Sequence, residues 1–114
     1  MPRDEVNLAD VLDSARLAMS YVQNVPWEEF SGNVQLQDAV IRRLELIGEA
    51  ARRVSEEGRR QYAQLPWSQM IGMRNVMIHQ YDAVDLGVVW DTIQRDLPPL
   101  VRAIEEIFSG GDGE

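Results

Sequence analysis

The sequence predicts an all-α protein, an antiparallel bundle of four to five helices. Apolar residues recur at three-and-four-residue spacing along nearly the whole chain, and no segment convincingly alternates as a strand would. Proline, glycine and asparagine separate the periodic segments. The 114 residues, 45% of them apolar, are enough for one core. We therefore expect a single helical domain over residues 1–108 and a flexible tail over residues 109–114, "SGGDGE".

Two long helices are predicted in the first half of the chain. The first carries an apolar stripe made of Leu8, Val11, Leu12, Ala15, Met19 and Val22. Asn24 and Pro26 then interrupt the pattern, and "PWEEF" adds a short turn of helix. The second long helix is expected from about Leu36 to about Glu57, and Gly58 suits its C-terminal end. Its inner face consists of Leu36, Val40, Leu44, Ile47, Ala51 and Val54.

The second half of the chain predicts further helices. One begins near Pro66, a residue suited to a first helical turn, and is expected to end near Tyr81. Asp85 is placed to cap the next helix, which runs to about Leu97. The pair "PP" at 98–99 then forces a kink or a restart, because proline lacks an amide hydrogen and clashes with the preceding turn. An apolar stripe of Leu100, Ile104 and Ile107 continues beyond it.

The charge pattern limits the function. A net charge of −8 argues against a protein that coats nucleic acid non-specifically, which needs a broad basic surface. All 11 basic residues are arginine. The pairs Arg42/Arg43 and Arg52/Arg53 flank Glu45 and Glu49, so ion pairs on a solvated helix face are favoured over a substrate-binding role. Among those glutamates, Glu49 is placed to pair with Arg52 and Arg53.

The same composition indicates where the protein works. There is no cysteine, no apolar run of a signal peptide and no stretch near the ~20 apolar residues that span a membrane. We expect a soluble, cytoplasmic protein without membrane contact.

The stretch "GMRNVMIHQY", residues 72–81, contains the chain's single histidine and is apolar around most of the predicted helix. At about 100° per residue, Arg74 and Tyr81 lie along one line. Gly72, Asn75 and His79 form a polar notch, with His79 about 140° from Arg74. An apolar helix of this kind is usually buried. A buried arginine needs a partner, and the sequence leaves three open: Glu49 or another acidic residue, a second chain, or a ligand phosphate.

The residue inventory narrows the chemistry of this stretch. One histidine without cysteine or an H-E-x-x-H pattern disfavours a metal site, and no P-loop, dinucleotide fingerprint or nucleophile elbow occurs. Acid–base work by His79, with Arg74 steadying an anion, remains. Cleavage of RNA needs only a base, an acid and a charge partner for the phosphorane, without metal or cofactor. A symmetric dimer would bring two histidines and two arginines to a shared cleft.

The motif R-x4-H-x-Y, formed by Arg74, His79 and Tyr81, resembles that of the HepT-like toxins of the HEPN superfamily. "NLADVLDSARLAMSYVQ", "QDAVIRRLELIGEAARRVSEE" and "LPWSQMIGMRNVMIHQYDAVDLGVVWDTIQRDLPPL" resemble the family in the same order, from about residue 8 to residue 107. The resemblance implies a bundle that dimerises through the motif-bearing helices. It also implies a metal-independent ribonuclease, the toxin of a prokaryotic toxin–antitoxin pair.

The resemblance also assigns roles to individual residues. Arg74 and His79 would be the catalytic pair, and Asn75 would support the site. Tyr81 would be the hydroxyl that the cognate antitoxin, a minimal nucleotidyltransferase, modifies with AMP. The added charge beside the cleft would then block RNA.

Two other readings of the sequence stay open. In one, the same fold is a non-catalytic nucleotide-binding or partner-binding module, in which Arg74 and His79 hold a phosphate without turning it over. In the other, the bundle is purely structural and Arg74 is tied to a carboxylate such as that of Glu49. The structural reading predicts that Arg74→Ala unfolds the protein, because breaking a buried ion pair costs about 3–5 kcal/mol.

Overall fold

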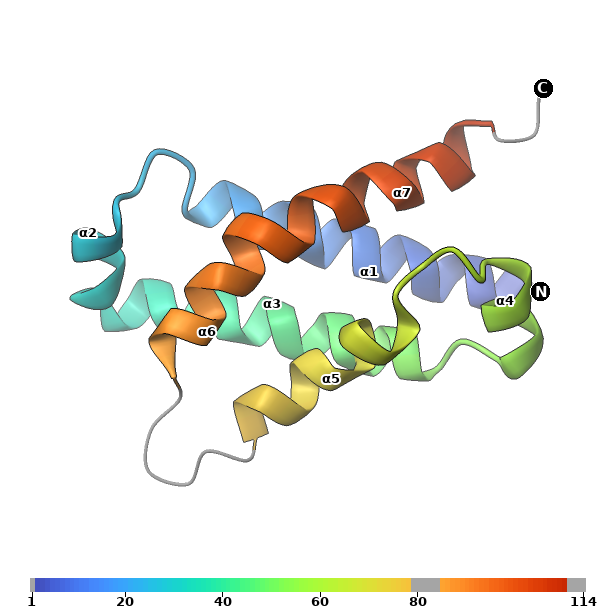
Figure 1. The fold of residues 1–114 in the computed structure, drawn as a ribbon, viewed down its shortest axis with the longest axis horizontal. Coiled ribbons are helices and arrows are strands. Elements are labelled where there is room, and N and C mark those ends of the chain that lie inside the picture. Colours follow the sequence, from blue (N-terminus) through green and yellow to red (C-terminus); the bar gives the residue numbers. More distant parts are fainter. Residues whose placement is uncertain (1, 79–84, 111–114) are drawn as a thin grey trace.

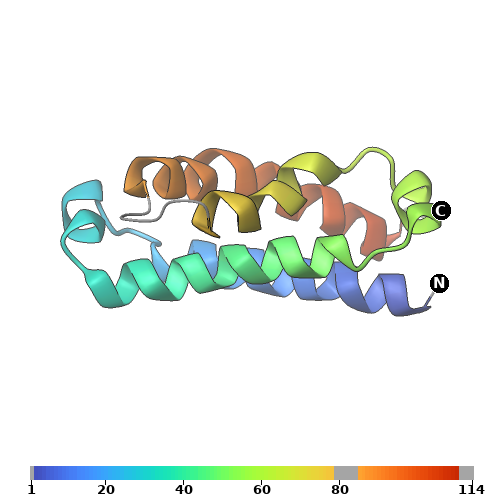
Figure 2. The ribbon, with the colours of Figure 1, turned by 90° about the horizontal axis from the view of Figure 1, so that it is seen from below.

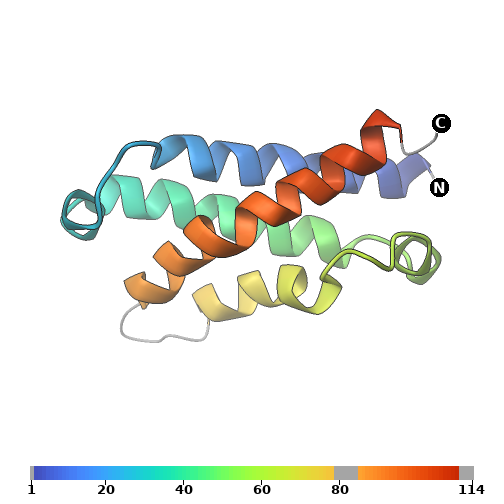
Figure 3. The same ribbon diagram turned by 45° about the horizontal axis from the view of Figure 1, so that its top comes forward.

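The predicted antiparallel all-α bundle is confirmed. The computed structural model describes residues 2–78 and 85–110. The helices in this part of the chain are α1 (Pro2–Tyr21), α2 (Trp27–Ser31), α3 (Val34–Arg52), α4 (Glu56–Gln61), α5 (Trp67–Ile78), α6 (Leu86–Asp91) and α7 (Leu97–Ser109), with a π-helical turn η1 (Thr92–Asp96) between α6 and α7. The long segments run alternately in opposite directions, and α1 begins at the end of the bundle where α7 ends (Figures 1 and 3).

The bundle has two layers (Figure 2). Helices α1 and α3 form one layer, and α5 packs on α3 while α7 packs on α1. The core lies between the layers. Its largest fully buried side chains include Phe30, Leu8, Leu44, Ile47, Met70, Ile93, Leu97 and Ile104. The arginine of the motif therefore lies on a helix that is held mainly by α3.

At the proline pair, where a kink or a restart was expected, the structure has a π-helical turn and no break in the helical path. The chain continues from α6 through η1 into α7 as one path (Figure 1), and the prolines occupy the first turn of α7. Because Pro98 and Pro99 cannot donate to the preceding turn, the π-helical turn just before them accommodates the missing hydrogen bonds. Asp85 caps α6 as expected, since its Oδ1 accepts from the backbone N of Gly87 at 3.0 Å and of Val88 at 3.3 Å.

The expected end of the second long helix was wrong. Helix α3 ends at Arg52, and Gly58 lies buried inside the separate helix α4. The reason is a contact with α1: Asp4 accepts from the backbone N of Ser55 at 3.0 Å and from its Oγ at 2.6 Å. Ser55 Oγ in turn accepts from the backbone N of Gly58 at 3.0 Å, which begins α4. A Cβ at Gly58 would lie 2.5 Å from Asp4 Oδ2, so only glycine fits there.

The Asp4 carboxylate gives the fold a pH dependence. The two hydrogen bonds from Ser55 hold the pKa of Asp4 below its ordinary value, against the opposing effect of burial. Because the folded-state pKa is the lower one, the carboxylate stabilises the fold above about pH 4, the unfolded pKa. This contribution is lost as the pH falls through the folded-state pKa. We expect Asp4→Asn to lower the melting temperature at pH 7, and the difference from wild type to shrink below pH 4.

The control for that measurement is Asp10→Asn, which removes an exposed carboxylate from the same helix. Melting temperatures of the three proteins from about pH 7 down to about pH 3 separate the two positions. A difference in melting temperature between wild type and Asp4→Asn that stays constant over this pH range would contradict a stabilising role of the Asp4 carboxylate.

No helix within residues 2–78 and 85–110 combines the length and the apolar character that crossing a membrane requires.

Candidate active site

Arg74 lies where α5 crosses α3 at its closest approach. Gly48 of α3 is buried beneath α5. A Cβ at Gly48 would lie 2.7 Å from the Cβ of Arg74, 2.9 Å from its backbone N and 3.2 Å from the carbonyl oxygen of Ile71. Real Cβ atoms essentially never approach heavy atoms under 3.0 Å. The absence of a side chain at Gly48 therefore sets the distance between the two helices and the position of Arg74.

Of the three partners that the sequence leaves open for Arg74, Glu49 lies within ion-pair distance, and the expected burial of Arg74 is wrong. Arg74 Nε lies 3.9 Å from Glu49 Oε2. Both side chains keep about a third of their surface exposed, 36% for Arg74 and 35% for Glu49. A long, solvated ion pair of this kind is worth less than about 1 kcal/mol. Glu49 thus holds the guanidinium loosely, and this contact alone does not occupy all of its N–H donors.

The ion pairs expected along α3 are found in part. Arg42 Nη1 lies 3.8 Å from Glu45 Oε1, as the spacing predicts. Within the described residues, by contrast, Arg52 and Arg53 form no ion pair with Glu49, whose contact is with Arg74 on the neighbouring helix. The expectation was wrong here because α5 brings a third arginine to the same glutamate.

A hollow of about 390 Å³ opens beside Arg74, and its lining is entirely charged: Glu49, Arg52, Arg53 and Arg74. A second hollow of about 290 Å³ adjoins it, lined by Gly48, Arg52, Ile71 and Arg74. Both hollows include Arg52 and Arg74, so the two cations border a continuous surface between α3 and α5. The sequence predicts that Arg52 and Arg53 lie on a solvated helix face and form ion pairs there. The signal that could have found them is their position one turn beyond Gly48, the glycine that suits a close helix crossing.

Gly72 faces a different space. Apart from the backbone of α5 itself, no heavy atom of the described part of the chain lies within 4 Å of where its Cβ would be. It borders a pocket of about 300 Å³ whose lining is Leu44, Gln69, Gly72, Met73, Val88, Thr92 and Asp96. This pocket shares no lining residue with the hollows beside Arg74. The separation agrees with the helical angles, which place Gly72 far around α5 from Arg74.

The remaining predicted site residues are not placed. His79 and Tyr81 lie outside the described residues, and of Asn75 only the backbone, in α5, is described. The structure therefore brings Arg74 together with Glu49 and two further arginines, while the roles of His79, Asn75 and Tyr81 stay predictions. Among residues 2–78 and 85–110, no group of three or more histidine, aspartate or glutamate side chains could hold a metal ion.

Comparison with known proteins gives one consistent result. The family described as Ribonuclease HepT-like matches residues 11–107. A protein named Putative RNase MJ1380, from Methanocaldococcus jannaschii, is 35% identical over 98 residues, which cover 86% of this chain and 90% of the relative. Probable ribonuclease HepT from Thermococcus cleftensis is 34% identical over 100 residues, 88% of this chain and 91% of the relative. No solved structure matches the chain significantly.

Proposed function

The chain belongs to the HepT-like ribonuclease family, and we propose that it is the RNA-cleaving toxin of a prokaryotic toxin–antitoxin pair. The match over residues 11–107 includes the whole stretch from Arg74 to Tyr81. One structural observation carries the proposal: the Arg74 guanidinium is about a third exposed, and its one ion pair within the described residues is a 3.9 Å contact. An arginine presented in this way is free to bind a phosphate, which it can contact with two parallel N–H donors.

The proposed reaction is metal-independent cleavage of the RNA phosphodiester. His79, as general base, removes the proton of the 2′-hydroxyl, and the 2′-oxygen attacks the adjacent phosphorus. Arg74 stabilises the negative charge that grows on the phosphoryl oxygens. The bond to the 5′-oxygen then breaks, and that oxygen takes up a proton from a second acid. The products are a 2′,3′-cyclic phosphate and a 5′-hydroxyl.

Two proton transfers and one histidine per chain favour a homodimer. On a straight helix Arg74 and His79 point in directions about 140° apart, so one chain does not readily bring both to a single phosphate. A symmetric dimer would place Arg74 of one chain and His79 of the other at a common cleft, twice over. Asn75, next to Arg74, would support that site.

The control of the toxin is proposed to lie at Tyr81. A nucleotidyltransferase antitoxin would direct the Tyr81 hydroxyl at the α-phosphate of ATP, so that a Tyr–AMP bond forms and pyrophosphate leaves. The adenylate places a negative charge two residues from His79, which repels the RNA backbone.

Arg74→Ala tests the assignment of the arginine. Because the ion pair with Glu49 is solvated, we expect the variant to stay folded, with the free energy of unfolding changed by less than about 1 kcal/mol. We expect the rate of RNA cleavage to fall about 10²–10³-fold, because a transition-state charge partner is lost. Circular dichroism during urea unfolding and a gel assay of labelled RNA measure the two effects.

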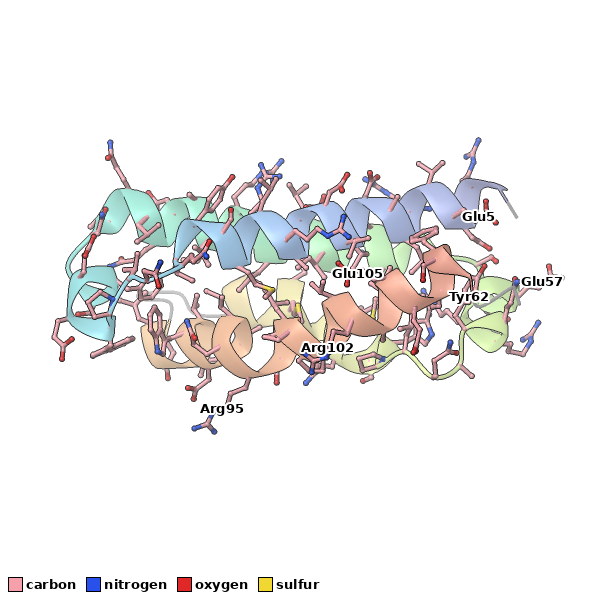
Figure 4. The ribbon with its side chains drawn as sticks, turned by 90° about the horizontal axis from the view of Figure 1, so that it is seen from above. Glu5, Glu57, Tyr62, Arg95, Arg102 and Glu105 are labelled. Atoms are coloured by element: carbon pink, nitrogen blue, oxygen red, sulfur yellow. The ribbon has the colours of Figure 1, made fainter. Side chains whose placement is uncertain are left out.

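Arg95→Ala is the control for Arg74→Ala. Arg95 points away from the helices (Figure 4), and its replacement changes the net charge by the same amount. An unfolded Arg74→Ala would contradict the account and favour the purely structural reading. A wild-type protein that binds nucleotides tightly but cuts no RNA would favour the non-catalytic binding module instead.

A further inference from the structure

The chain as a whole is acidic, yet one part of it is not. Residues 48–74 carry five arginines against three glutamates, whereas the rest of the chain carries six arginines against 16 carboxylates. Three of those five arginines line the charged hollow between α3 and α5. A polyanion approaching this protein is repelled by most of the surface and attracted to this one region.

The hollow has the composition of a phosphate site. Among the described residues, three arginines and one glutamate form its lining, and Glu49 is the one acidic residue there. Arg52 and Arg53 are exposed, and within the described residues neither forms an ion pair. At about 30 Å³ per water molecule, a hollow of about 390 Å³ has room for a phosphate group with part of its hydration shell.

The local structure keeps these arginines beside Arg74. The Gly48 crossing fixes α5 against α3 one turn before Arg52. The end of α3 is held in turn by α4, because Arg59 Nη2 donates to the carbonyl oxygen of Arg52 at 3.0 Å. The second hollow, with Gly48 and Ile71 in its lining, joins Arg52 to Arg74.

We propose that Arg52 and Arg53 bind the phosphate of a nucleotide next to the scissile one and so position single-stranded RNA along the end of α3. The proposal rests on the proposed ribonuclease function, and it makes the two arginines positioning residues. The scissile phosphate would lie at Arg74, and the neighbouring phosphate would lie in the hollow lined by Arg52 and Arg53.

The simpler explanation of the pair is helix stability. Arginines near the C-terminus of a helix interact favourably with its dipole, and this effect needs no ligand. Such a role predicts that replacing them changes the melting temperature and leaves RNA affinity unaltered. Affinity and its salt dependence therefore distinguish the two explanations.

The test measures binding of an RNA that cannot be cut. A fluorescently labelled single-stranded oligonucleotide, 2′-O-methylated throughout, is titrated with the full chain at salt concentrations from about 50 to about 200 mM, and the anisotropy is recorded. The double variant Arg52→Ala/Arg53→Ala is compared with Arg42→Ala/Arg43→Ala, which lies on the same helix and removes the same charge. Arg42 and Arg43 line neither hollow.

We expect the Arg52/Arg53 variant to bind about tenfold more weakly, with a salt slope smaller by about 0.7, as for one phosphate that is no longer neutralised. The Arg42/Arg43 control should bind like wild type. Replacing Arg52 and Arg53 with lysine should restore most of the slope, because the point charge is kept. On cleavable RNA, KM should rise in the alanine variant with little change in kcat.

Three results would overturn the inference: equal weakening by both alanine pairs, no weakening by Arg52→Ala/Arg53→Ala, or a lysine variant that binds no better than the alanine one. None of them decides the proposed function, because cleavage by wild type and its loss in Arg74→Ala are measured separately. Conversely, a wild type that does not cut RNA can still show the binding pattern expected of the hollow.

Discussion

Gly48→Ala is expected to lower the free energy of unfolding by up to about 2 kcal/mol. The new methyl group would lie 2.7 Å from Arg74 Cβ and 2.9 Å from its backbone N, and neither atom can rotate away. Overpacking of this kind typically costs about 1–3 kcal/mol, and more where backbone must move. Alanine improves helix propensity by only about 1 kcal/mol, so the clash outweighs it. Urea unfolding followed by circular dichroism measures the change.

Gly72→Ala is the matched control, since it makes the same substitution on the partner helix of the same crossing. Among the described residues, no atom outside the backbone of α5 lies within 4 Å of the new methyl group, so we expect only the gain in helix propensity. We expect this variant to be as stable as wild type or up to about 1 kcal/mol more stable. If Gly48→Ala and Gly72→Ala shift stability in the same direction and by the same amount, the close crossing of α3 and α5 is wrong.

His79→Ala is expected to lower the rate of RNA cleavage by about 10²–10⁴-fold, because general acid–base catalysis contributes about that much. We expect the circular dichroism spectrum and the melting temperature to stay close to those of wild type. Gln80→Ala, at the unspecified position between His79 and Tyr81 of the R-x4-H-x-Y motif, should cut RNA at the wild-type rate. Initial rates on one labelled RNA compare the three proteins. Cleavage by His79→Ala at the wild-type rate would remove His79 from the site.

Sequence patterns between residues a few positions apart predicted much of the fold. The apolar stripes predicted the helices, and Asp85 was predicted as a helix cap. The prolines at 98–99 predicted a departure from regular α-helix before α7. These features depend on residues a few positions apart. The end of α3 could not be found in this way, because it depends on Asp4, which is 51 residues from Ser55 in the chain.

The candidate site was predictable in its residues more than in its surroundings. Arg74 followed from the motif, and Glu49 was one of three partners that the sequence left open for it. The exposure of Arg74 did not follow, because a helix that is apolar on nearly every side does not indicate which side is left open. Helical spacing pairs Arg52 and Arg53 with Glu49. The crossing of α5 over α3 shows that Glu49 contacts Arg74 instead.

The exposed arginines elsewhere show why charge alone did not locate the site. Arg16 of α1 forms an ion pair with Glu105 of α7, in which Arg16 Nη2 lies 2.7 Å from Glu105 Oε2. Glu105 lies between the two helices, and Arg95 points outward from the bundle (Figure 4). Neither arginine lines the charged hollow between α3 and α5. Three-dimensional grouping, rather than the number of arginines, distinguishes the region around Arg74.

We propose that this chain cuts RNA with Arg74 and His79 and without a metal ion. The most direct measurement incubates purified wild type and His79→Ala with labelled RNA in excess EDTA and identifies the product ends. We expect wild type to cut at an undiminished rate and to leave 2′,3′-cyclic phosphate and 5′-hydroxyl ends. We expect His79→Ala not to cut the RNA. Cleavage that stops in EDTA and returns with added magnesium, or that leaves 3′-hydroxyl ends, would contradict the proposal.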